Sequence, residues 1–294
     1  MRAVVSAVCL IAFFAAAGPS LSAQWPRRMP PDVPKAANGQ VDLNAPVPRT
    51  ADGHPDLSGL WRGAPFAGPA GGGRRGGGPP TATPPPPALP GNAAPAADVP
   101  PPANFLDIGQ NVPGGLPMTP FAQELLKTRV AGNSKDNPEA HCLPMGIIQL
   151  HTQGAPRRFL QTPRELVILY EASADRREIF TDGRALPPLG DPQPFWNGYS
   201  VGRWDGDTLV VTSNNFRDNG WLDVKGSPLT DQGIITERFR RVSYGRMEID
   251  ITIDDKKAYT KPFTVRVNQR LMVDSEMIEF ICNENEKSTD HIAK

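Results

Sequence analysis

The last two-thirds of the chain repeat one pattern, in which short runs of alternating apolar and polar residues are separated by turn signals. In the run 246–253 every second residue is apolar (Met247, Ile249, Ile251 and Ile253). Phe263, Val265 and Val267 repeat the alternation, as do Ile278 and Phe280 ahead of Cys282. A period of two places alternate side chains on opposite faces of a β-strand, one face inward and one in water. The pattern therefore predicts a mostly antiparallel β domain.

The clearest hairpin signal covers residues 198–212. Two β-prone runs flank Asp205 and Gly206. An Asp-Gly pair between such runs favours a two-residue type I′ turn, whose twist matches the flanking strands. Asp205 and Asp207 also suggest a calcium site, but calcium takes six to eight oxygens and a tight hairpin supplies few. We therefore predict a hairpin and no metal here.

With Gly59–Trp61 included, we expect roughly eight to ten strands, a number at which closure into a barrel removes the exposed edges. The predicted fold class is all-β, an antiparallel up-and-down barrel over residues 104–294, and a two-sheet sandwich is the alternative. One short helix is expected near its start. Thr119 can cap this helix, Pro120 suits its first turn, and Gly132 ends it.

The N-terminal third differs in composition. Arg2 followed by the apolar run 4–17 and by Leu21-Ser22-Ala23 predicts a signal peptide over residues 1–23. Residues 24–103 are rich in proline and glycine, and such a segment has too little apolar surface to fold alone, so we predict a long disordered region. Within it, residues 56–62 read as a short strand that packs on the barrel. The predicted location is periplasmic or secreted.

The cysteine count agrees with that location. Removal of the signal peptide takes Cys9 away and leaves Cys142 and Cys282. An even number of cysteines in an oxidising compartment predicts one disulfide, and two buried free thiols are the alternative. Neither cysteine has a second ligand at zinc spacing, and no haem-attachment motif is present, so no metal and no cofactor are predicted.

Charge and composition restrict the partners. The chain carries 31 basic and 31 acidic residues, so its formal charge is zero and nucleic acid is not an expected partner. Hydrophobic residues make up 39% and charged residues 21%, which argues against an integral membrane protein. Arg74 and Arg75 in the Pro/Gly-rich tail could contact the cell envelope, although a passive linker is the better interpretation.

Two resemblances can be stated. Residues 142–146, 182–184, 198–211 and 237–241 resemble motifs of a group of uncharacterised secreted bacterial proteins, the most distinctive being Gly-Arg-Trp-Asp-Gly-Asp-Thr at 202–208. Asp56-Leu57-Ser58-Gly59-Leu60-Trp61 looks like the Gly-x-Trp first strand of lipocalin-like (calycin) barrels. The second resemblance implies a closed barrel that holds a small ligand.

Candidate ligand-binding residues cluster around the hairpin. We select Trp196, Tyr199, Arg203, Trp204, Arg184 and Glu237. The faces of the 199–204 strand leave two alternatives: either Tyr199 and Arg203 point inward, or Trp204 does and Arg203 is exterior. Glu237 and Arg241 could line a pocket beside Phe239, but the favoured alternative is an exterior cross-strand row of ion pairs between residues 237–241 and the acids Glu248 and Asp250.

No catalytic motif is present, since the chain has no Gly-x-Ser-x-Gly, His-Glu-x-x-His or phosphate-binding loop. The leading hypothesis is a barrel that binds a small, largely apolar ligand. An enzyme, an isomerase or a hydrolase, would use the same cavity with Asp182, Arg184, Glu237 or His151 as acid or base. An envelope-associated structural module is the third hypothesis.

Overall fold

The computed structural model describes residues 29–63, 99–191, 193–282 and 284. The predicted signal peptide and most of the Pro/Gly-rich stretch lie outside the described residues. The structure therefore gives no comparison for the predicted signal peptide and only a partial one for the Pro/Gly-rich region.

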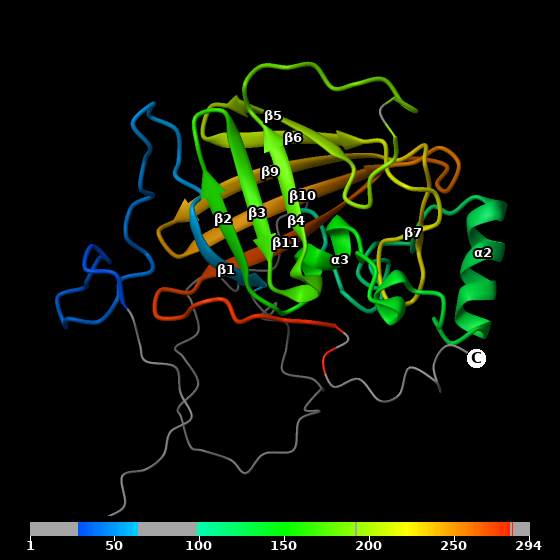
Figure 1. Cartoon of the computed structure of the whole chain (residues 1–294), viewed down its shortest axis with the longest axis horizontal. Coiled ribbons are helices and arrows are strands. Elements are labelled where there is room, and N and C mark those ends of the chain that lie inside the picture. Colours follow the sequence, from blue (N-terminus) through cyan, green and yellow to red (C-terminus); the bar gives the residue numbers. More distant parts are fainter. Residues whose placement is uncertain (1–28, 64–98, 192, 283, 285–294) are drawn as a thin grey trace, which may run out of the picture.

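Nine strands close into a barrel with the order β1-β11-β10-β9-β6-β5-β4-β3-β2 (Figure 1). Their bounds are β1 Gly59–Gly63, β2 Arg157–Gln161, β3 Glu165–Tyr170, β4 Arg176–Phe180, β5 Tyr199–Asp205, β6 Thr208–Asn214, β9 Ile234–Ser243, β10 Arg246–Asp254 and β11 Phe263–Leu271. A separate short pair joins β7 Gly220–Trp221 to β8 Pro228–Leu229. The prediction of a closed β-barrel is confirmed.

One pair of strands departs from the predicted up-and-down antiparallel arrangement. β4 and β5 run parallel, with Ile179 opposite Ser200 and Phe180 opposite Val201. Parallel neighbours need a connection that returns along the barrel, and residues 181–198 make that return. The antiparallel prediction is therefore corrected at this pair, where a long connection replaces a hairpin.

β1 closes the barrel rather than packing on its outside. Trp61 lies opposite Arg157 of β2 on one side and Leu271 of β11 on the other. Its indole is fully buried and donates to the Leu57 carbonyl at 3.0 Å. The guanidinium of Arg241 stacks over the same ring at 5.0 Å. The short strand read from residues 56–62 is thus a structural member of the barrel.

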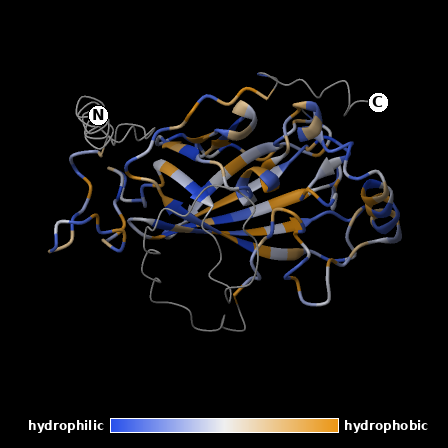
Figure 2. Ribbon diagram, turned by 90° about the horizontal axis from the view of Figure 1, so that it is seen from below, coloured by the Kyte–Doolittle hydropathy of each residue, from blue (hydrophilic) through white to orange (hydrophobic). Residues whose placement is uncertain are grey.

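The alternation predicted for the later strands is present. Ile249, Ile251 and Ile253 of β10 and Val265 of β11 are fully buried, and Figure 2 shows hydrophobic and hydrophilic bands alternating along the strands. The strand that the same alternation predicted at Ile278 and Phe280 is absent. These two side chains are exposed, and residues 272–281 form no strand because β1, not this segment, pairs with β11.

The hairpin turn lies one residue later than predicted. Asp205 pairs with Thr208, so Gly206 and Asp207 form the two-residue turn. Gly206 has φ +57°, while Asp207 is not in the positive-φ region. Glycine with positive φ at the first central position is the type II′ pattern, not type I′. The Asp207 carboxylate points away from the turn backbone and accepts hydrogen bonds from Arg49 at 2.8 and 2.7 Å.

The helices lie outside the barrel wall. α2, Pro120–Ala131, begins at the predicted cap Thr119, whose hydroxyl accepts from the Ala122 amide, and Gly132 ends it. The 3₁₀ helices η1, Pro138–His141, and η2, Ala172–Ala174, are single turns, and α3, Ile147–Thr152, was not predicted. In the described part of the chain no helix is long and apolar enough to cross a bilayer.

Each end of the barrel is covered. At one end, residues 29–58 lie across the strands, where the Leu43 carbonyl accepts from Gly245 and the Asp56 carbonyl accepts from Arg241. At the other end lies α3, whose residues 147–151 are all buried. The N-terminal segment and α2 lie on opposite sides of the barrel in Figure 1.

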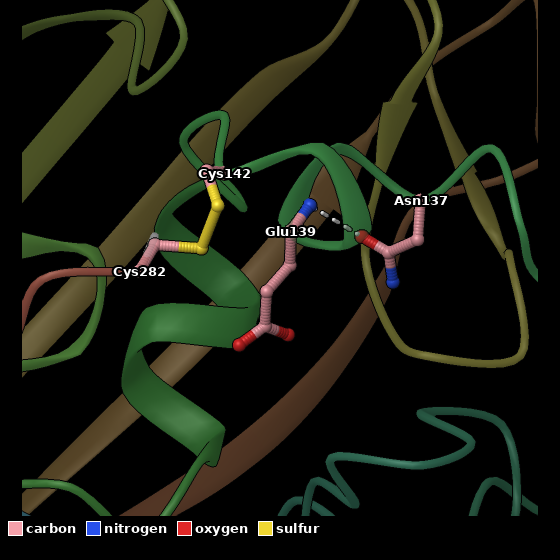
Figure 3. The surroundings of a disulfide bond; sticks show 4 residues. All are labelled: Asn137, Glu139, Cys142 and Cys282. Atoms are coloured by element: carbon pink, nitrogen blue, oxygen red, sulfur yellow. Dashed lines mark hydrogen bonds between the residues drawn. A yellow bond between two sulfur atoms is a disulfide. The ribbon is translucent and has the colours of Figure 1, made fainter. Parts of the chain in front are cut away.

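The predicted disulfide is present in the structure. Cys142 and Cys282 are bonded with their Cα atoms 5.6 Å apart, although 140 residues separate them. Cys142 follows η1, whose N-cap Asn137 accepts from the Glu139 amide at 3.2 Å (Figure 3). The bridge therefore attaches the segment after β11 to the segment that leads into α3.

Candidate functional site

An ion pair lies inside the barrel near the end that α3 covers. Arg177 on β4 donates to both carboxylate oxygens of Glu237 on β9, at 3.0 Å from Nη1 to Oε1 and through a shorter bond from Nη2. Both side chains are almost completely buried. Each follows the alternation of its strand, Arg177 in phase with Ile179 and Glu237 in phase with Phe239. The strand pattern therefore directs both charges inward.

His151 extends this ion pair. It is fully buried at the end of α3, and its Nε2 lies 3.2 Å from Glu237 Oε1. Burial lowers the pKa of His151 below 6.5, although Glu237 acts in the opposite direction. The imidazole is therefore neutral at pH 7. Its Nε2 then donates to Glu237, and its Nδ1 has no hydrogen-bond partner among the residues that the structure describes.

Two serines and a tyrosine complete the cluster. Ser200 on β5 and Ser213 on β6 accept from Arg177 at 3.2 and 2.9 Å and lie 2.8 Å apart. The Tyr170 hydroxyl lies 3.5 Å from His151 Nε2. Burial would raise the pKa of Glu237, but Arg177 and His151 outweigh it and hold that pKa at about 2. We call these six residues, listed here in chain order, the ionic cluster: His151, Tyr170, Arg177, Ser200, Ser213 and Glu237.

A second buried guanidinium lies beside the cluster without a carboxylate. Arg157 on β2 donates to the carbonyls of His151, Gln153 and Ala155 at 2.7–3.0 Å. Its Nε has no partner. Burial lowers the pKa of Arg157 to about 10, which still leaves it charged at pH 7. Arg157 thus fixes the loop between α3 and β2 and adds a positive charge to the interior.

A small cleft opens on the outer side of α3. Ile147 and Ile148 of α3 form part of its wall, and the remaining lining is mostly apolar, with Met145, Trp196, Phe216, Trp221 and Leu229. Arg217 lies at its rim, with its guanidinium 5.1 Å from the centre of the Trp196 ring. The cleft volume is about 10 Å³, enough for one water molecule. α3 therefore contributes residues to both the cleft and the ionic cluster.

The predicted ligand-binding residues do not come together in one site. Trp196 lines the cleft. Tyr199 and Arg184 meet on the barrel exterior, where Arg184 donates to the Tyr199 hydroxyl at 3.1 Å and to Asp182 at 2.9 and 2.7 Å. Trp204 stacks on His54 at 4.5 Å near the opposite end.

The structure decides between the two orientations that the sequence left open for Arg203 and for Glu237. Ser200 is buried inside the barrel, so the face of β5 that carries Ser200 and Trp204 points inward and Arg203 is an exposed exterior charge. Glu237 is interior, which corrects the favoured exterior position. The exterior row does form, but from the other face of β9, where Arg238 pairs with Asp205 and Arg240 with Glu248.

Sequence reasoning missed four members of the ionic cluster and two residues near it. These are Tyr170, Arg177, Ser200 and Ser213 in the cluster, Arg157 beside it and Arg217 at the cleft. A signal for Arg177 was present, because Arg177 and Glu237 are opposite charges that each occupy an apolar phase of a strand. Only the barrel closure, however, brings β4 and β9 to facing positions. Nothing in the strand pattern indicated Arg217, since it lies in the loop after β6.

Comparison with family models, with curated proteins and with solved structures finds no match to this chain. Among the described residues, no three His, Cys, Asp or Glu side chains come together as a metal site. The function must therefore be argued from the cleft and the ionic cluster themselves.

Proposed function

We propose that this is a secreted protein whose barrel binds a small, largely apolar ligand in the cleft beside α3. The observation that carries the proposal is the cleft lining, where Trp196, Phe216 and Trp221 meet the apolar side chains of Met145 and Leu229. Apolar and aromatic walls with a few polar groups are the usual character of small-molecule sites. The disulfide supports secretion, because such bonds persist in oxidising compartments.

The ligand position differs from that expected from the sequence. The inward side chains of the barrel, including the ionic cluster, are packed against one another and buried. The cleft is at the barrel end instead, and its rim residue Trp196 is only half-buried. Because the cleft has room for only about one water molecule, a ligand requires the half-buried Trp196 side chain to shift on binding.

Isothermal titration calorimetry of the full chain with neutral lipophilic compounds, such as 2-naphthalenemethanol and decanol, tests this proposal. We expect saturable binding that Trp196→Ala weakens about tenfold, the loss that follows from removing an aromatic wall. Trp204→Ala is the matched control, because Trp204 lies at the other end of β5, against His54. Absence of saturable binding, or equal loss in both variants, contradicts the proposal.

A second candidate function, acid–base catalysis, is favoured by one observation. His151 and Glu237 lie 3.2 Å apart, with the Tyr170 hydroxyl next to the imidazole. Paired titratable groups of this kind serve as general acids and bases, provided that a substrate reaches them. Their complete burial requires α3 to move before any reaction.

Histidine modification with diethyl pyrocarbonate, read by mass spectrometry, tests this requirement. His141 is exposed and serves as the internal positive control. Catalysis in the barrel predicts that His151 is modified in the native protein at a measurable rate. Modification of His141 alone would exclude an accessible catalytic His151.

A further inference from the structure

We propose that the ligand of the cleft is an apolar or aromatic monocarboxylate and that Arg217 selects it, an inference that rests on the proposed function. The cleft combines an apolar wall with one cation at its rim. The proposal concerns ligand class, so it can fail while the cleft still binds neutral compounds.

The Arg217 side chain is exposed and has no carboxylate partner in the described part of the chain. Within the described residues, its side chain makes a cation–π contact with Trp196. The neighbouring acid, Asp218, is already engaged by Lys257 at 3.3 Å. Some other exposed arginines are paired with carboxylates, such as Arg49 with Asp207 and Arg238 with Asp205, whereas the exposed Arg203 forms no ion pair within the described residues. Arg217 therefore offers positive charge that the protein does not neutralise.

Among the described residues no carboxylate occupies the N–H donors of Arg217, whose guanidinium carbon lies 5.1 Å from the centre of the Trp196 ring. A guanidinium lying on an aromatic ring uses its flat face, while its N–H donors lie in the plane and can hold a carboxylate in a two-bond fork. The stack also fixes the guanidinium beside the apolar lining, which is where the acidic end of an apolar ligand would lie. A ligand with one carboxylate on an apolar body matches both the guanidinium and the apolar lining.

The backbone holds this pair of residues together. Phe195 donates to the Asn215 carbonyl at 2.8 Å, and the Arg217 amide donates to the Phe195 carbonyl at 3.0 Å. These two bonds attach the segment that carries Trp196 to the loop after β6. The cation and the aromatic wall are therefore positioned by main-chain contacts rather than by the length of the arginine side chain.

A comparison of matched ligands tests the inference. We expect 2-naphthoate to bind about tenfold more tightly than 2-naphthalenemethanol, which has the same apolar body without the charge. Arg217→Gln should remove this preference, with a larger loss of affinity for the acid than for the alcohol, and Arg217→Lys should retain it only in part, because an ammonium cannot form the fork. Raising the salt concentration should weaken binding of the acid alone.

Arg203→Gln is the matched control, because Arg203 is an exposed arginine on the barrel exterior away from the cleft. Equal affinities for the acid and the alcohol, or an equal loss of acid binding in the two glutamine variants, would overturn the inference and leave the cleft proposal intact. Failure of both ligands to bind would contradict the cleft proposal itself. Unchanged thermal unfolding of Arg217→Gln shows that any loss is local.

Discussion

Buried arginines in this protein fall into two kinds that differ in what holds their charge. Arg129, Arg157 and Arg241 each donate to backbone carbonyls, and burial lowers the pKa of each to about 10. Arg177 alone among them is matched by a buried carboxylate. The first kind fixes loops around the barrel, whereas the second kind joins two strands that face each other across its interior.

The Arg177–Glu237 pair gives the first prediction. Glu237→Leu should destabilise the protein by about 3–5 kcal/mol, because an arginine cannot lose its charge and would remain buried without a partner. The double variant Arg177→Met/Glu237→Leu should be less destabilised than Glu237→Leu, since it removes both charges. Urea unfolding at pH 7 measures both.

The control for this prediction is an exposed pair on the same strand. Arg238→Gln breaks the contact with Asp205, and the two side chains of that contact are 48% and 67% exposed. We expect a change below about 1 kcal/mol. If Glu237→Leu lowers the free energy of unfolding no more than the control does, then the buried Arg177 does not depend on its carboxylate partner and the prediction is wrong.

The second prediction concerns pH. The folded-state pKa of His151 is below 6.5, so the unfolded chain takes up this proton first and the free energy of unfolding should fall as the pH drops below about 6.5. The groups around this imidazole are Glu237, Arg177, Arg157 and Tyr170. Glu237 affects the pH dependence of unfolding only at lower pH. Its stabilising effect is fully present above pH 4.5 and is lost as the pH falls toward 2.

Unfolding measured from pH 7.5 to 5.5 for the native protein and for His151→Gln separates these contributions. The variant should show a smaller slope, whatever its absolute stability. His141→Gln is the matched control, since His141 is exposed. An unchanged slope in His151→Gln would mean that another group carries the pH dependence.

At the scale of elements, the hairpins were the most predictable part. Strands such as β10 show two-residue periodicity because one face is buried and the other is in water, and that signal is local. α3 gave no such signal. Its residues 147–151 are all buried, so it has no polar face and its pattern resembles that of a buried strand. The parallel β4–β5 pair was also missed, because strand direction depends on where the connection 181–198 travels.

The turn at Gly206 gives the third prediction. Gly206→Ala should cost about 1–2 kcal/mol, because φ of +57° places a Cβ in the left-handed region that non-glycine residues avoid. The space around a Cβ is open there, so the cost is conformational and not steric. Chemical denaturation measures it.

Gly154→Ala is the matched control, since this glycine has an ordinary φ and equally open surroundings. We expect it to change stability by less than about 0.5 kcal/mol. Equal effects of the two substitutions would contradict the assignment of the turn.

For the whole molecule, the disulfide gives the fourth prediction. It closes a loop with a sequence separation of 140, and in the chain-entropy model this closure contributes about 4–5 kcal/mol. Cys142→Ser/Cys282→Ser should lose stability of that order, measured by urea unfolding without reductant. The native protein unfolded with reductant is the comparison, and it should match the variant. No difference between oxidised native protein and variant would mean that the bond does not restrict the unfolded chain.

The sequence alone determined the β content, most strand positions, the helix cap at Thr119 and the pairing of two cysteines, because each depends on local pattern or on a count. Only the tertiary structure decided which side chains meet. Arg177 and Glu237 are 60 residues apart and become partners through barrel closure. Trp196 and Arg217 meet through two loops at one end of the barrel. Such contacts depend on strand order and loop path, which two-residue periodicity does not encode.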